Sequence, residues 1–73
     1  MMRISEKIRH LRQEYGWSQS ELSRKARVPQ TTISGIERDR HFPTLKHLFQ
    51  IASAFGISLS ELLKDVDDFE RRG

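Results

Sequence analysis

The side chains best suited to chemistry lie in one polar stretch, from Gln30 to Arg38. Ile33 and Ile36 are three residues apart, so a helix would turn both toward one inner face. The opposite face would then carry Gln30, Thr31, Ser34, Gly35 and Arg38. Glutamine can pair with adenine through two hydrogen bonds, and threonine offers a hydroxyl and a methyl group. This face therefore has groups that suit base-pair edges, although an isolated polar face is more often simply solvated.

Other chemistries find little support in the sequence. The three histidines, His10, His41 and His47, are not spaced as helical metal ligands, and there is no cysteine to complete a site. No nucleophile is paired with a base, so we expect no metal, no cofactor, no small-molecule substrate and no enzyme. We assign the aromatic residues Trp17, Phe49 and Phe55 to the core or to hydrophobic staples, not to a platform that stacks unpaired bases.

Apolar spacing and start signals predict five short helices and no strand. The expected helices cover residues 5–15, a segment from Ser18 to a point before Pro29, residues 30–38, residues 44–55, and a segment beginning at Ser58. Joined by short turns, they predict a compact all-α bundle. The third has poor helix propensity, so its neighbours must hold it in place.

Several residues mark the ends of these helices. Ser5 is placed to cap the first helix and Gly16 to end it. Ser18 with Glu21 has the spacing of a capping box, in which two side chains and two backbone N–H groups pair reciprocally. Ser58 repeats this signal at the last helix, with an acidic residue three positions later.

The second and third helices form a helix-turn-helix pattern, in which the second helix of the pair lies in the major groove of DNA. From Ile4 to Leu63 the chain resembles the DNA-binding domain of the Cro/phage-repressor (Xre-like) family. The resemblance rests on Ile8-Arg9-His10-Leu11-Arg12 with Gly16, Ser18-Gln19-Ser20-Glu21-Leu22, Gln30-Thr31-Thr32-Ile33-Ser34 with Ile36-Glu37, and Pro43, Leu45, Leu48, Ile51, Ala52 and Phe55-Gly56-Ile57-Ser58. It implies a five-helix, lambda-repressor-like fold, a double-stranded DNA partner and a small transcriptional regulator, such as a repressor.

The resemblance also implies residue roles. The expected base contacts are Gln30, Thr31, Ser34 and Gly35. The expected phosphate contacts are Gln19, Arg27, Thr32, Arg38, Arg40 and Lys46. Arg12 and Glu37 match a structural ion pair that joins the first helix to the end of the third.

Three positions depart from the family pattern. Gly35 stands where relatives carry a long polar side chain, so a contact is missing or the backbone approaches DNA more closely. Arg27 occupies a turn position usually held by glycine, where a left-handed backbone strains other residues. Pro29 replaces the usual hydroxyl cap, although proline is tolerated at a helix start.

The two ends of the chain differ in charge. Up to Lys46 there are ten Lys and Arg against five Asp and Glu, and beyond it three against five. A basic first part suits a polyphosphate partner. If the last helix continues into the tail, one apolar stripe forms a dimer surface: Leu59, Leu63, Val66 and Phe69. In the alternative, the leucines pack on the core while Val66 and Phe69 fray.

The 73 residues suffice for one domain, which we place at residues 1–64, with a charged tail at 65–73 that extends the last helix if the stripe is real. No apolar run has the length of a membrane span, and the start lacks the pattern of a signal peptide, so we expect a cytoplasmic protein without a membrane partner. A protein-interaction module on the same fold, antitoxin-like or a co-regulator subunit, is the alternative function.

Overall fold

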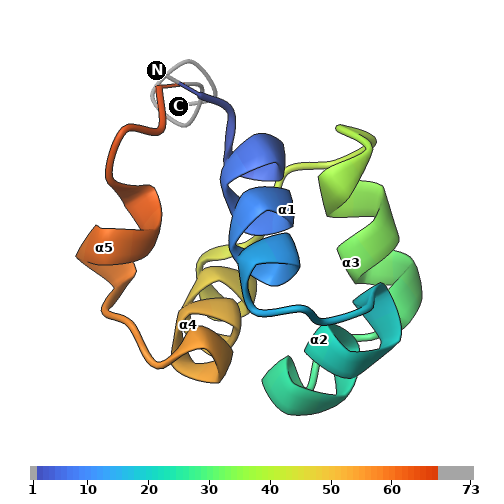
Figure 1. Ribbon diagram of the computed structural model, residues 1–73. Coiled ribbons are helices and arrows are strands. Elements are labelled where there is room, and N and C mark those ends of the chain that lie inside the picture. The colour runs from blue at the N-terminus through green and yellow to red at the C-terminus, as the bar shows by residue number, and fades with distance from the viewer. Residues whose placement is uncertain (1, 68–73) are drawn as a thin grey trace.

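The computed structural model describes residues 2–67 and contains five helices in that part of the chain (Figure 1). They are α1 (Ile4–Glu14), α2 (Gln19–Ala26), α3 (Gln30–Glu37), α4 (Leu45–Phe55) and α5 (Leu59–Leu63). No strand is present among the described residues, apart from a single bridge that pairs Met2 with Val66. The prediction of an all-α bundle is confirmed.

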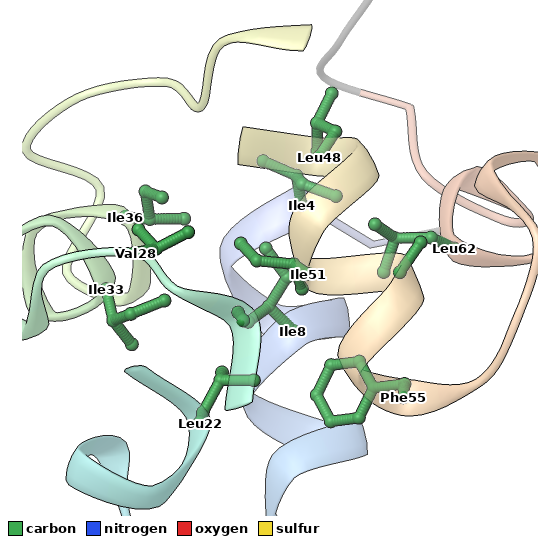
Figure 2. Close-up of a cluster of buried hydrophobic side chains, with 12 residues drawn as sticks. Ile4, Ile8, Leu22, Val28, Ile33, Ile36, Leu48, Ile51, Phe55 and Leu62 are labelled. Carbon is green, nitrogen blue, oxygen red and sulfur yellow. The ribbon is translucent and has the colours of Figure 1, made fainter. Parts of the chain in front are cut away.

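All five helices contribute to one apolar core. Each supplies one aliphatic side chain with no exposed surface, and these are Ile8, Leu22, Ile33, Ile51 and Leu62 (Figure 2). Burial of such a side chain contributes about 1.5–3 kcal/mol, so the core is the main source of stability in a chain without disulfides. Helix α1 packs against both α3 and α5, which lie on opposite sides of it (Figure 1).

Local side-chain caps begin three of the helices, and those of α2 and α5 are the serines that the sequence predicts. Ser18 and Glu21 form the full capping box, with both hydrogen bonds at 3.0 Å. Thr44 Oγ1 accepts from the backbone N–H of His47 at 3.1 Å. Ser58 Oγ accepts from the N–H of Glu61 at 3.0 Å.

The predicted cap of the first helix is wrong. Helix α1 begins at Ile4, with Arg3 as the cap residue, and Ser5 is buried inside the first turn. The backbone N–H of Arg3 donates to the carboxylate of Glu6 at 2.9 Å. Because Ile4 is itself part of the core, the helix starts early enough to bury it.

The last helix does not extend into the described part of the tail. Helix α5 ends at Leu63, Lys64 is extended, and Asp65 has a left-handed backbone with φ of 67°. The chain then runs beside the N-terminus, where Met2 N–H donates to Asp65 O at 2.9 Å and Asp67 N–H donates to Met2 O at 3.0 Å. Residues 65 to 67 are therefore joined to the N-terminus by backbone hydrogen bonds.

The aromatic residues form a cluster on one end of the bundle. The rings of Trp17 and Phe55 stack at 5.4 Å, and Tyr15 meets both rings edge-on. The Tyr15 hydroxyl also donates to the Phe55 carbonyl at 2.6 Å.

Phe49 lies outside this cluster and is 54% exposed, so its assignment to the core is wrong. Helix α4 turns Leu48, Ile51, Ala52 and Phe55 inward, which leaves Phe49 outside the buried stripe.

Candidate nucleic-acid interface

A short turn of three residues joins α2 to α3. Its first residue, Arg27, has a left-handed backbone with φ of 58° and ψ of 41°, the geometry that usually favours glycine. Two hydrogen bonds fix the turn: Ser23 Oγ donates to Val28 O at 2.6 Å, and Val28 N–H donates to Ser23 O at 3.2 Å. Val28 is buried in the core, so the turn fixes the position of α3 relative to α2.

Helix α3 buries one side and presents a short polar surface on the other. Ile33 and Ile36 are buried in the core. Gln30 and Thr31 are exposed at the start of the helix, and Ser34 and Thr32 are half-buried. The structure therefore brings the predicted base-contact residues Gln30, Thr31 and Ser34 together along the first half of α3.

Gly35 does not lie on an open face, contrary to the sequence-based expectation. The glycine is buried, and a methyl group built on it would overlap Cε1 of the His41 imidazole. Both ring nitrogens of His41 would also lie within 2.9 Å of that methyl group. The 3.6-residue period placed Gly35 on the outer side correctly, but the loop after α3 folds back and covers it.

A buried carboxylate holds α3 in its orientation. Glu37, which is 4% exposed, accepts from Arg12 Nε at 2.8 Å and from Arg12 Nη2 at 3.0 Å. The Gln19 amide donates to the same carboxylate at 3.0 Å, and Arg9 donates to the Glu37 carbonyl at 3.1 Å. We call the side-chain contacts of Arg12, Gln19 and Glu37 the α3 clamp, because they join α1, α2 and the end of α3.

The clamp contains the Arg12–Glu37 ion pair expected from the family resemblance. The hydrogen bond to Glu37 raises the pKa of Arg12, against the opposing effect of burial, and the negative charge of Glu37 raises it further. Arg12 therefore stays charged, as a bidentate contact with a carboxylate requires. A third donor of Arg12, Nη1, reaches the Trp17 carbonyl at 2.9 Å and fixes the chain just before α2.

The remaining predicted phosphate contacts are exposed cations around the two ends of α3. Arg27 lies in the turn before the helix, Arg38 and Arg40 follow its end, and Lys46 lies in the first turn of α4. Gln19, in contrast, is half-buried in the clamp.

The sequence did not predict two contacts near α3. Arg9 was given no role of its own, yet it donates to the Glu37 carbonyl. Its spacing three residues before Arg12, on the same face of α1, is a signal that could have found it. His41 gave no signal, because its contact with Gly35 depends on how the loop folds.

The predicted dimer residues lie away from α3. Leu59, Leu63 and Val66 are half-buried and pack partly against the core, while Phe69 lies outside the described residues. Within residues 2–67, no cluster of three metal-ligating side chains occurs, and none of the helices could cross a membrane.

Comparison with known proteins agrees with the helix-turn-helix formed by α2 and α3. The helix-turn-helix family matches residues 8–62. The chain is 35% identical over 66 residues to the HTH-type transcriptional regulator DdrOP3 of Deinococcus deserti, covering 90% of this chain and 51% of that protein. It is 34% identical over 62 residues to the immunity repressor protein of Bacillus phage phi105, covering 85% of this chain and 43% of the repressor.

A solved complex of SinR protein with SinI protein contains a chain of the same fold, with a TM-score of 0.78 and 30% sequence identity. The match covers 94% of this chain and 72% of that one. The chain spans about half the length of the two relatives above. The chain belongs to the helix-turn-helix family.

Proposed function

We propose that this protein binds double-stranded DNA in a sequence-specific manner, with α3 in the major groove, and acts as a small transcriptional regulator. The observation that carries the proposal is the exposure of Gln30 and Thr31 at the start of a helix whose far end is held by the α3 clamp. A rigidly placed helix can present the same groups to the same base edges in every encounter. Gln30, Thr31 and Ser34 are the proposed base contacts.

The proposed phosphate contacts surround this helix. The exposed cations Arg27, Arg38, Arg40 and Lys46 can each reach toward a strand of the duplex, and Thr32 adds a half-buried hydroxyl. Gln19 uses one amide hydrogen in the clamp and keeps a second for a phosphate oxygen. Such contacts position the protein without selecting sequence.

We propose a two-fold dimer on DNA, with two α3 helices about one helical turn apart, roughly 34 Å. The continuous helical stripe does not form, because α5 ends at Leu63, so the proposed dimer surface is limited to the parts of Leu59, Leu63 and Val66 that remain exposed while these residues pack on the core. Helix α5 lies on the side of α1 opposite to α3. We also propose a cytoplasmic location, because a transcriptional regulator must share a compartment with the DNA that it binds.

A protein-interaction module is the second candidate. The likeness to a chain of the SinR protein and SinI protein complex favours it, since that relative was solved together with a protein partner. In this reading, the protein tolerates DNA without preferring any sequence.

Selection from a random double-stranded library tests the two functions against each other. The selected duplex and a scrambled duplex are then titrated by fluorescence anisotropy over a salt series. We expect a preference of about 10³ or more for the selected duplex, and an enriched palindrome if the dimer forms. Weak, salt-sensitive binding without enrichment would contradict sequence-specific binding and favour the protein-interaction module.

The salt series also tests the phosphate contacts. Arg40→Ala should weaken binding to both duplexes alike and lower the salt slope by about one unit. Arg24→Ala is the matched control, because Arg24 is an exposed arginine in the last turn of α2 to which we assign no DNA contact. An unchanged slope for Arg40→Ala would contradict its phosphate contact.

A further inference from the structure

The loop after α3 places a histidine on the groove-facing side of the helix. Helix α3 ends in a Schellman motif, in which Arg40 N–H donates to Gly35 O at 2.8 Å and Asp39 N–H donates to Ile36 O at 3.1 Å. Asp39 adopts the left-handed backbone that this motif requires, with φ of 60°. This reversal of the chain brings His41, which follows Arg40, back over Gly35.

Only a glycine accommodates the imidazole in this position. A methyl group at residue 35 would overlap Cε1 of His41 and would lie 2.8 Å and 2.9 Å from its two nitrogens. Gly35 is buried as a result, while His41 itself remains exposed. The ring therefore occupies the space that a side chain at position 35 would fill.

This position lies among the proposed DNA contacts. Gly35 comes four residues after Thr31, so the ring stands on the same side of α3 as Thr31, and Ser34 lines the same hollow. A hollow of about 330 Å³ at this place is lined by Thr31, Ser34, Gly35, Arg38, Arg40 and His41. The ring thus shares one hollow with two proposed base contacts, Thr31 and Ser34, and with two of the proposed phosphate contacts.

Resting on the proposed function, we propose that His41 is a specificity-determining residue that reads DNA in place of the side chain that Gly35 lacks. An imidazole N–H can donate to purine N7 or guanine O6, which are the acceptors exposed in the major groove. Gly35 is a positioning residue in this account, because it gives the ring its place on the helix. The loop after α3 thus supplies a hydrogen-bond donor for base edges to the outer side of the helix.

The geometry has a test that does not involve DNA. In the free protein, we expect a nuclear Overhauser effect between His41 Hε1 and the Hα protons of Gly35. Gly35→Ala should abolish this proximity, since the added methyl group forces the exposed ring to move away. Absence of the effect in the unmodified protein would overturn the proposal.

The reading role is tested by binding to the selected duplex and to duplexes with one base pair changed at a time. His41→Ala should lower the preference at one base-pair position about tenfold. Gly35→Ala should lower it at the same position, and the double variant should lose no more than the larger single loss. His10→Ala removes an exposed histidine from α1 and should leave every preference unchanged.

Two results would overturn this inference while leaving the proposed function intact. One is a loss from His41→Ala that is equal for all duplexes and accompanied by a lower salt slope, since this would make His41 a phosphate contact. The other is a double variant whose loss is the product of the single losses, since the two residues would then act independently. If the unmodified protein prefers no sequence at all, the proposed function fails, and the reading role of His41 fails with it.

Discussion

Helices α3 and α4 are neighbours in the chain and are stabilised in opposite ways. Helix α4 has a hydroxyl cap at Thr44, four buried apolar residues, and a left-handed glycine, Gly56, at its end. Helix α3 buries only two isoleucines as apolar side chains, its cap residue Pro29 has no side-chain acceptor, and its far end is held by side chains from α1 and α2. A helix that must keep a polar outer side has little apolar surface of its own, so its neighbours supply the stability.

The largest expected effect concerns the core of α4. Ile51→Ala should lower the free energy of unfolding by about 4 kcal/mol, because it leaves a cavity where a fully buried side chain was. Phe49→Ala on the same helix should change it by less than about 0.5 kcal/mol, since that ring is mostly exposed. Urea titration followed by circular dichroism measures both. Similar losses for the two variants would contradict the account of which face of α4 is buried.

The next largest effect concerns the α3 clamp. Arg12→Ala should cost about 3 kcal/mol, because it leaves the buried carboxylate of Glu37 without its charged partner. Arg3→Ala is the matched control: it removes an ion pair with Asp39 in which the arginine side chain is 62% exposed, and it should cost less than about 1 kcal/mol. Urea titrations at constant pH compare the two. An Arg12→Ala loss no greater than that of Arg3→Ala would mean that the clamp does not hold α3.

A smaller loss of stability is expected from removing the hydroxyl cap at the start of α4, a cap that α3 lacks. Thr44→Ala should cost about 1 kcal/mol, since the N–H of His47 loses its side-chain acceptor. Thr44→Ser keeps the hydroxyl and should restore most of the stability. Equal stability of the alanine and serine variants in thermal unfolding would show that α4 does not depend on its local cap.

The smallest expected effect concerns Arg27, whose left-handed backbone ends α2 as that of Gly56 ends α4. Arg27→Gly should raise the stability by about 0.5 kcal/mol, because glycine adopts this backbone without strain but loses more entropy on folding. For a domain of this size, that corresponds to a melting temperature higher by about 3 °C. Arg27→Ala keeps the strain and should show no increase. A gain in the alanine variant would point to the arginine side chain and not to the backbone.

The parts of the fold that follow from local signals could be predicted from the sequence. The starts of α2 and α5 depend on a serine cap and its partner three residues away, and both were found at the predicted residues. The true start of α1 and the end of α5 could not be predicted in this way. Helix α1 starts early enough to bury Ile4 in the core, and the chain after α5 pairs with the N-terminus through the bridge between Met2 and Val66, so both depend on contacts between distant parts of the chain.

The same distinction applies to the candidate site. The polar face of α3 and the Arg12–Glu37 partners could be identified from the periodicity and the family resemblance, respectively. The place of His41 over Gly35 could not, because it depends on the left-handed turn at Asp39. Turn geometry of this kind could be predicted where a glycine marks it, as at Gly16 with φ of 72°, or where the family resemblance does, as at Arg27 with φ of 58°.

The most direct test of the central claim is the sequence preference of Gln30→Ala beside that of the unmodified protein. Both are titrated with the selected duplex, with its single-base-pair variants and with a scrambled duplex at one salt concentration. If α3 reads base edges, Gln30→Ala loses discrimination at one position, by about 1–3 kcal/mol, and binds the scrambled duplex as before. An equal loss for all duplexes, or no loss at all, would contradict the placement of α3 in the major groove.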